Sequence, residues 1–248
     1  GAPAVSFVIG HRGEERVPLL LATLASLKAQ DGCGAEIVVV EQATRPILQE
    51  RLPEGVRWIH QVPLVPDMPY SRSWAFNRGA EEARGRVVVL HDNDILAPAG
   101  YAAEIVRLAV EGFEAMRLMR FLFCLAQEAT AEILRSPGSA TRLLRNSSPE
   151  AIRQNCHGGT IAVTREAYFR IGGHDEGFVG WGGEDNEFFD RCRLLRFHPW
   201  GYLPFVHLWH CPQPEKSRPI GAQGRLREVM VVPREERVRK LVGAGRSW

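Results

Sequence analysis

The sequence lacks several features that would place it in a common class of protein. Its five cysteines are scattered and form no Cys-x-x-Cys pair, which argues against a zinc knuckle or a redox dithiol. No apolar run approaches the roughly 20 residues that a membrane-spanning helix needs. The formal net charge is only +2, too small to indicate a partner nucleic acid. We see no internal repeat and no low-complexity tract.

The composition also indicates which cellular compartment and how many domains to expect. The sequence opens without a signal-peptide pattern and runs directly into the apolar stretch Val5–Ile9. Since scattered cysteines favour reduced thiols, we expect a cytoplasmic protein. At 248 residues and 45% hydrophobic content, the chain is long enough to bury the core of one α/β domain.

Strand patterns alternate with helical patterns in the first part of the chain. This alternation predicts a mainly parallel sheet flanked by helices, with ligands beyond the carboxyl ends of the strands. The polar residues after three strands, His11-Arg12, Glu41-Gln42 and Asp92-Asn93-Asp94, should therefore lie at one edge. The predicted strands are Val5–Ile9, Ile37–Val40, Val56–Ile59, Val87–Leu90 and Tyr202–Trp209, and the predicted helices include Leu19–Leu27 and Ser73–Ala83.

The rest of the chain has a less regular pattern. Tyr101–Ile133 is predicted to be mostly helical, and the stretch Ser136–Pro149, rich in Ser, Pro, Gly and Arg, is predicted to be a loop. The tail after Pro212 is basic with interspersed glutamates. We expect an exposed, solvated helix there, and peripheral contact with anionic lipid is the alternative.

The segment 180–187, Gly-Trp-Gly-Gly-Glu-Asp-Asn-Glu, is the most informative part of the sequence. Glycines on both sides of Trp181 allow the backbone to approach a ligand closely or to move. Crowded carboxylates repel one another and gain proton affinity, so one of Glu184, Asp185 and Glu187 could serve as a general base. The alternative is a glycine turn before an acidic helix N-terminus, where the helix dipole favours carboxylates.

Two further groups of residues suggest a site for a metal and an anion. Asp92 and Asp94 follow a buried strand, and their hard oxygens suit Mg²⁺ or Mn²⁺, although a turn with self-bonded Asp and Asn side chains is the alternative. His207 and His210 end the last predicted strand, and residues three apart on a strand face opposite sides. We therefore expect only one histidine to reach a metal, and one imidazole among carboxylates favours Mn²⁺.

Arginine side chains near the same strand ends are candidates for binding phosphate or a nucleobase, because the guanidinium group presents a planar fork of donors. These are Arg12, Arg72 and Arg78. A surface ion pair is the alternative for each of them.

In their collinear order, these motifs resemble the inverting glycosyltransferases of the GT-A fold, most closely the β1,4-galactosyltransferase group and the chondroitin-polymerase-type family 2 transferases. Val8–Arg12 is similar to the family's opening strand and nucleobase loop, with Gly10 in place of the usual proline, and Ile37–Gln42 is similar to its second strand. Tyr70–Gly79 resembles the segment before the metal motif, and Asp92-Asn93-Asp94 fits its Asp-x-Asp. The most specific match is 157–191, which contains His-Gly-Gly-Thr, a second Gly-Gly and the Trp-Gly-Gly-Glu-Asp segment.

The resemblance implies a GT-A domain over residues 1–212, with a nucleotide-sugar-binding half at 1–100, an acceptor and catalytic half at 150–212, and a basic tail at 213–248. It implies Mn²⁺, with Mg²⁺ as the alternative, held by Asp94, Asp92 and His210, with His207 as the alternative histidine. Asp185 would be the catalytic base and Glu184 a neighbour that helps bind the acceptor. The implied donor-binding residues are Gly10, His11, Arg12, Glu41, Arg72, Asn77, Asp92, Asn93, Asp94, Trp181 and Gly183, and the implied acceptor and sugar pocket is Cys156, His157, Gly158, Gly159 and Trp181.

The function implied is inverting transfer of a hexose or N-acetylhexosamine from a UDP-sugar to a hydroxyl of a glycan or a glycosylated small molecule. In the resembling galactosyltransferases, a tyrosine two residues before the Gly-Gly lies against C2 of the donor sugar, and the smaller Cys156 stands there in this chain. Two alternatives remain. A nucleotidyltransferase would more naturally carry a Gly-rich basic loop after the first strand, and a non-catalytic nucleotide-sugar or glycan-binding module would not need the full set of acidic residues.

Overall fold

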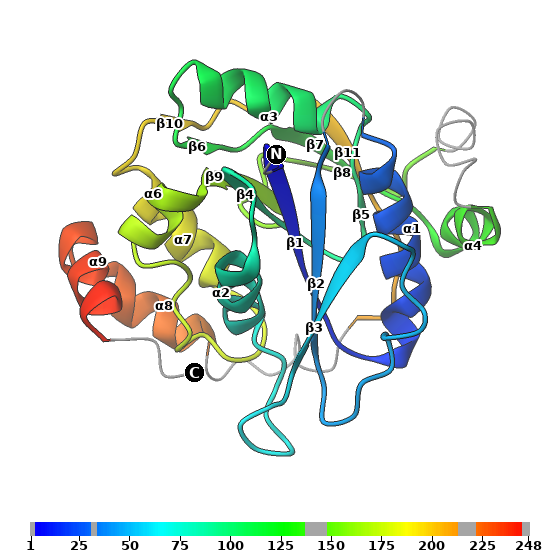
Figure 1. Ribbon diagram of the computed structural model, residues 1–248, viewed down its shortest axis with the longest axis horizontal. Helices are drawn as coiled ribbons and strands as arrows, with labels where there is room; N and C mark the ends of the chain where they lie inside the picture. The colour runs from blue at the N-terminus through cyan, green and yellow to red at the C-terminus, as the bar shows by residue number, and fades with distance from the viewer. Residues whose placement is uncertain (1–2, 31–33, 137–147, 213–221, 245–248) are drawn as a thin grey trace.

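Two β-sheets organise the computed structural model, which describes residues 3–30, 34–136, 148–212 and 222–244 (Figure 1). The larger sheet comprises β1 (Val5–His11), β2 (Glu36–Gln42), β3 (Val56–Gln61), β4 (Val87–His91), β6 (Ala115–Met116), β9 (Thr160–Thr164) and β10 (Phe197–His198). The smaller sheet comprises β5 (Ile95–Leu96), β7 (Met119–Cys124), β8 (Ala151–Gln154) and β11 (Leu203–His207).

The larger sheet has the order β10-β6-β9-β4-β1-β2-β3 and is mostly parallel. The strands β1 to β4 all run in one direction, whereas β9 is antiparallel to both β4 and β6. β1 and β4 are buried along their whole length, because helices cover both faces of the sheet. This arrangement confirms the predicted α/β fold with a mixed, mainly parallel sheet.

The helices are placed on the two faces of the larger sheet and around its ends. On one face, α1 and α3 contribute to a core with Phe7, Ile9 and Val89, and on the other α2, α6 and α7 pack with Val8, Val88 and Ile161. The helices are α1 (Val17–Lys28), α2 (Arg72–Glu82), α3 (Tyr101–Val110), α4 (Gln127–Arg135), α6 (Arg165–Arg170), α7 (Glu184–Cys192), α8 (Ala222–Met230) and α9 (Arg234–Gly243), with a 3-10 turn, η1 (Glu14–Arg16), before α1.

Most predicted elements of the first part of the chain are confirmed, as strands β1 to β4 and helices α1 and α2. The prediction that Tyr101–Ile133 is mostly helical is wrong in its middle, where β6 and β7 form. The methionines and leucines of this stretch have good helix propensity, but β7 pairs with both β8 and β11, and this pairing overrides it. The predicted strand Tyr202–Trp209 is confirmed for β11, which ends two residues earlier.

The described part of the basic tail, residues 222–244, is helical and mostly exposed, as its charge pattern predicts, but it also packs against the domain. It contains two helices, and α9 lies beside α6 and α7 (Figure 1) with Arg237 only 6% exposed. Most of the predicted loop, residues 137–147, and the predicted boundary between domain and tail, at 213–221, lie outside the described residues. Within the described residues, the helices are all too short or too polar to cross a bilayer.

Candidate active site

A cavity of about 530 Å³ lies at the edge where β1 and β4 end, and residues from widely separated parts of the chain line it. It brings together most of the residues that the sequence predicted for the donor, the metal, the acceptor and the base. Those lining it are Gly10, Arg12, Arg72, Asp92, Asn93, Asp94, Cys156, Gly158, Gly159, Trp181, Glu184, Asp185 and His210.

A group of ligands suited to a metal ion lies on one wall of this cavity. Asp94, His207 and His210 each offer a ligand atom, and these atoms all lie within 4.8 Å of one another. The Nε2 atoms of His207 and His210 are 3.7 and 3.3 Å from Oδ2 of Asp94. Oxygen and imidazole nitrogen together form a donor set that suits Mn²⁺.

The expectation that only one of the two histidines reaches the metal site is wrong. No continuous strand runs from His207 to His210, because β11 ends at His207 and the Leu208 N–H donates to the carbonyl oxygen of Asp94 (2.9 Å). The chain therefore leaves strand geometry before His210, and both imidazoles approach the same carboxylate.

Arg16 is a residue of this site that sequence reasoning missed. Its Nη2 donates to Oδ2 of Asp94 (2.7 Å) and to Oδ1 of Asn93 (3.2 Å), from the end of η1. Burial alone would raise the pKa of Asp94, but the hydrogen bond from His210 and the charges of His207 and Arg16 hold that pKa well below its usual range. Asp94 is therefore ionised near neutral pH. The only signal for Arg16 in the sequence is its position, four residues after Arg12.

Arg72 is the central cation of the cavity. Its Nε donates to Oδ1 of Asp92 (2.7 Å), and its Nη1 donates to Asp185 and, at 3.4 Å, to Oε1 of Glu184. Ser71 caps the start of α2 by accepting the Trp74 N–H, which fixes Arg72 as the first residue of that helix. One guanidinium group thus holds three carboxylates, from the end of β4 and from the start of α7, around one space.

The two acidic residues at the start of α7 have different environments. Glu184 is buried, and its Oε2 has no hydrogen-bond partner among the described residues. Burial, with the charge of Asp185 as the next cause, raises the pKa of Glu184 to about 7. The Asp185 side chain is 28% exposed and lines the cavity. Asp185 is therefore the more accessible of the two carboxylates to an entering hydroxyl group.

The backbone of Gly158 packs directly against Asp185. A Cβ atom at position 158 would lie 2.4 Å from Oδ2 of Asp185, closer than atoms can approach. The absence of a side chain at this position is therefore what leaves room for the carboxylate.

Five predicted site residues do not line the cavity: His11, Glu41, Asn77, His157 and Gly183. Glu41 is buried and accepts two backbone N–H groups and an indole N–H, and Asn77 is buried against a backbone carbonyl and a tyrosine hydroxyl. His157 stacks on a phenylalanine ring with the centroids 4.1 Å apart, and Gly183 caps α7. Burial lowers the pKa of His11 to about 4, so it is neutral and bonds Asn93.

Arg78 is not part of the site. It forms ion pairs with Glu82 (2.9 Å) and Glu81 (3.8 Å) on its own helix, so the alternative interpretation of a surface ion pair is confirmed. Further residues line the cavity that were not predicted as site residues: Glu15, Tyr70, Ile95, Leu122, Arg153 and Gly180.

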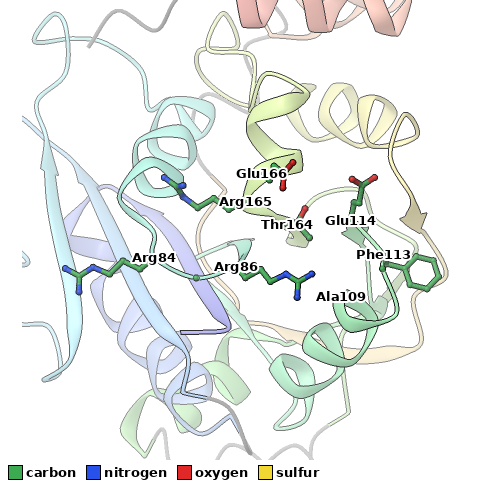
Figure 2. Close-up of a pocket in the computed structure, with 10 residues that line it drawn as sticks. Arg84, Arg86, Ala109, Phe113, Glu114, Thr164, Arg165 and Glu166 are labelled. Carbon is green, nitrogen blue, oxygen red and sulfur yellow. The ribbon is translucent and has the colours of Figure 1, made fainter. Parts of the chain in front are cut away.

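A second cavity, of about 430 Å³, lies at the opposite end of β4 (Figure 2). Arg84, Arg86 and Arg165 contribute to its lining, and Arg165 already donates to two carbonyl oxygens at the end of α2. Of the described residues that line it, none is a predicted site residue. The first cavity is therefore the candidate active site.

Comparison with protein families decides the class of this site. The sequence model of glycosyl transferase family 2 matches residues 6–168, which is more than half of the chain. The chain belongs to glycosyl transferase family 2. This family 2 protein is a glycosyltransferase, as its motifs predicted. A second model, described as the N-terminal domain of galactosyltransferase, matches residues 142–202. No curated protein matches the sequence.

Solved structures similar to this family 2 transferase are also glycosyltransferases. The mannosyltransferase PcManGT from Pyrobaculum calidifontis, in complex with GDP-Man and Mn²⁺, has a TM-score of 0.56 at 16% identity, over 98% of this chain and 74% of that one. GalNAc-T7 with UDP, GalNAc and Mn²⁺ has a TM-score of 0.57 at 18% identity, over 85% of this chain and 44% of that one. These similarities confirm the GT-A fold. The catalytic domain of Drosophila beta1,4galactosyltransferase 7, in complex with xylobiose, has a TM-score of 0.46 at 18% identity, over 86% of this chain and 77% of that one.

Proposed function

We propose that this transferase moves a hexose or N-acetylhexosamine from a UDP-sugar to a hydroxyl of a glycan or a glycosylated small molecule, with inversion and with a divalent metal ion. The observation that carries the proposal is a single cavity that holds both the group Asp94, His207 and His210 and the carboxylate of Asp185. The complex of GalNAc-T7 with UDP and Mn²⁺ supports a uridine donor, and the galactosyltransferase match at 142–202 supports transfer of a hexose.

The residues present fit Mn²⁺. Asp94, His207 and His210 would hold the ion, with Asp92 as a neighbouring carboxylate, and this mixed set favours Mn²⁺ over Mg²⁺. Bound there, the ion would supply a Lewis acid for the departing diphosphate. Because Arg16 already donates to Oδ2 of Asp94, Arg16 and the metal would compete for that oxygen.

The chain's own residues supply the remaining chemistry. An acceptor hydroxyl is a poor nucleophile at neutral pH, so Asp185 would take its proton as the oxygen attacks the sugar C1. Attack from the face opposite the diphosphate inverts the anomeric carbon. Arg72 donates to Asp92 and to Asp185, and a donor diphosphate would compete with both carboxylates for this guanidinium. Donor binding would thereby free Asp185 to act as a base.

Incubation with a panel of UDP-sugars and Mn²⁺, with and without candidate acceptors, tests the proposed function. A transferase is expected to release UDP slowly by hydrolysis without an acceptor and faster with the correct one. Binding of a UDP-sugar with no UDP release would identify a non-catalytic binding module instead. Release of pyrophosphate from nucleoside triphosphates would identify a nucleotidyltransferase.

Gly158→Ala is expected to lower turnover by about 10²-fold while the protein keeps its fold. The added methyl group would displace the Asp185 carboxylate, and a displacement of about 1 Å from the reactive position can cost a factor of this size. Steady-state rates and a thermal melt of the same preparation measure the two effects. Gly100→Ala is a suitable control, since its added Cβ would meet nothing within 4 Å. A Gly158→Ala enzyme as active as the Gly100→Ala control would contradict the role of this contact.

Cys156→Tyr is expected to change the choice of donor. Cys156 lines the cavity, and if it lies against C2 of the donor sugar, its small side chain admits UDP-GalNAc or UDP-GlcNAc as well as UDP-Gal. A tyrosine would fill that space and favour UDP-Gal. The ratio of turnover with UDP-Gal and UDP-GalNAc, measured for both proteins, checks this. A ratio that does not change shows that Cys156 does not set donor choice.

A further inference from the structure

The C-terminal helices contact both segments that flank the glycine loop, residues 180–183. This loop carries Trp181 and leads directly into α7, whose first two residues are Glu184 and Asp185. Upstream of the loop lies the segment 174–179, and downstream lies α7 itself. Side chains from α8 reach the first, and side chains from α9 reach the second.

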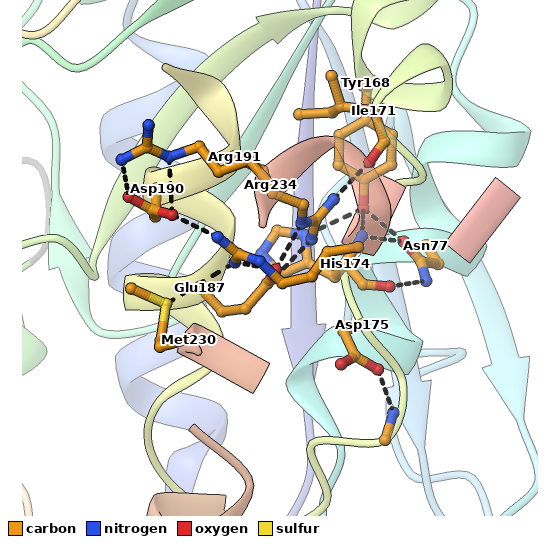
Figure 3. A network of polar contacts seen from close by, with 12 residues as sticks. Asn77, Tyr168, Ile171, His174, Asp175, Glu187, Asp190, Arg191, Met230 and Arg234 are labelled. Atoms are coloured by element: carbon orange, nitrogen blue, oxygen red, sulfur yellow. Dashed lines mark hydrogen bonds and ion pairs between the residues drawn. The ribbon is translucent and has the colours of Figure 1, made fainter. Parts of the chain in front are cut away.

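The downstream contact is a largely buried network of ion pairs between α9 and α7 (Figure 3). Arg237 of α9 donates to Oε1 of Glu187 (2.7 Å) and to Oδ2 of Asp190 (2.5 Å), and Arg234 donates to both oxygens of Asp190 (2.9 and 2.7 Å). Arg191 donates to both carboxylate oxygens of Glu187 (2.7 Å each), and its Nη1 donates to the Ile171 carbonyl oxygen (2.5 Å). Arg191 therefore connects Glu187 to the backbone that precedes the loop. The side chains of Arg191, Glu187 and Arg237 are 0%, 2% and 6% exposed, so this part of the network is screened from water, whereas Arg234 is partly exposed.

The upstream contact uses a second arginine. Arg225 of α8 donates to both carboxylate oxygens of Asp175 (2.8 Å each), and its guanidinium carbon lies 5.4 Å from the centroid of the Phe178 ring. The carbonyl of Phe178 in turn accepts the Ser71 hydroxyl (3.2 Å), next to Arg72 of the active site. Segment 174–179 is therefore held by α8 through Asp175 and by Ser71 through the Phe178 carbonyl.

Close packing shows that α9 is a fitted part of the domain. Gly172 has a φ of 88°, which favours glycine, and a Cβ added there would lie 2.6 Å from the Cβ of Leu241 on α9. Because Gly172 has no side chain, α9 can approach the turn at this residue more closely than any other residue there would allow. A tail that only carried charge would not require this fit.

We propose that Arg225 and Arg237 are positioning residues for sugar transfer: they fix the two flanks of the glycine loop, confine backbone movement to 180–183 and hold Asp185 at the cavity. The proposal rests on the proposed function, because it takes Asp185 as the base. Without Arg237, Glu187 and Asp190 lose the one cation that bonds both of them, and Glu187 keeps Arg191 while Asp190 keeps Arg234. The loss of this link between α9 and α7, with less positive charge to offset repulsion among the acidic residues of α7, would then shift the first turn of α7.

Arg237→Ala and Arg225→Ala in the full-length chain test the proposal, with Arg239→Ala as the matched control. Arg239 lies on the same helix, is exposed and carries the same charge. For the two test variants, kcat is expected to fall by about 10- to 100-fold, as for a small misplacement of a catalytic group, while the Kd for UDP with Mn²⁺ stays near that of the wild type. Arg237→Lys is expected to recover part of kcat, since it restores the charge without the fork of donors. Arg239→Ala should behave as the wild type.

Hydrogen exchange provides a readout that does not depend on activity. Backbone amides of residues 180–190 are expected to exchange faster in Arg237→Ala than in Arg239→Ala. If the wild type transfers no sugar but this difference appears, the proposed function fails and the role of the two arginines in holding α7 stands.

Three outcomes would overturn the proposal: kcat and exchange both equal to the Arg239→Ala control, an equal loss of kcat and UDP affinity, or an Arg237→Lys variant no better than Arg237→Ala. If Arg237→Ala does not fold, the same comparisons are made with Arg237→Lys and Arg225→Ala against the same control.

Discussion

Asp185→Asn is expected to lower turnover by about 10²- to 10⁴-fold, the range ascribed to general-base catalysis. The amide keeps the size of the carboxylate and its ability to accept a hydrogen bond from Arg72, but it cannot take a proton from an acceptor hydroxyl. Donor affinity should not fall, because Asp185 faces the acceptor in the proposed arrangement and competes with the donor diphosphate for Arg72. Steady-state rates with a saturating UDP-sugar, together with a separate measurement of UDP binding, check both statements.

Glu184→Gln is the informative companion to that variant. Glu184 is buried beside Asp185, and its pKa of about 7 leaves it partly protonated at neutral pH, so replacing it with a neutral amide removes only part of a negative charge. We therefore expect a smaller loss of turnover. If Asp185→Asn keeps near-normal turnover and Glu184→Gln loses it, the base is Glu184.

Asp94→Ala is expected to remove most transfer activity and most metal-dependent donor binding. Asp94 is the carboxylate that both His207 and His210 approach, so its loss removes the charged member of the group. Titration of UDP in the presence and absence of Mn²⁺ measures the metal-dependent part of the affinity. The stability of Asp94→Ala should be compared with the wild type without metal, because Arg16 also loses its partner.

The histidines and a chelator complete this test. Because both imidazoles lie near Asp94, His207→Ala and His210→Ala should each weaken the response to Mn²⁺. EDTA should abolish transfer by the wild type, and added Mn²⁺ should restore it. Transfer at the normal rate after EDTA treatment would show that the metal assignment is wrong.

The sequence predicted the parts of the fold that depend on short-range pattern. β1, β2 and β4 are runs of apolar residues that both faces of the sheet bury, and such runs leave a plain signal. That Asp94, Arg72 and Asp185 line one cavity was predicted because Asp94 follows a strand end and because the motifs resemble those of a known family. These are the features on which local sequence and tertiary structure agree.

The features that the sequence did not predict depend on long-range contacts. Arg16 lies in an ordinary charged stretch, and only the path of the chain from η1 brings it to Asp94. Arg237 has the composition of an exposed helix around it, and its burial depends on carboxylates some fifty positions earlier in the chain. The position of His210 depends on where β11 ends, which single-sequence patterns locate only to within about two to four residues.

The antiparallel course of β9 has a consequence for how this domain can diversify. His91 of β4 pairs with Thr160 of β9, so the connection that leaves β4 and the connection that enters β9 meet at the same point above the sheet. The first carries Asp92 and Asp94, and the second carries Cys156 and Gly158. The Asp92 N–H donates to the Gly159 carbonyl oxygen (2.9 Å) where the two connections meet, so only the part of the second connection before Gly158 can change in length or composition without shifting the first. In the proposed function, a change of donor sugar or acceptor is thus open to this scaffold through one segment, while the segment that carries Asp92 and Asp94 stays as it is.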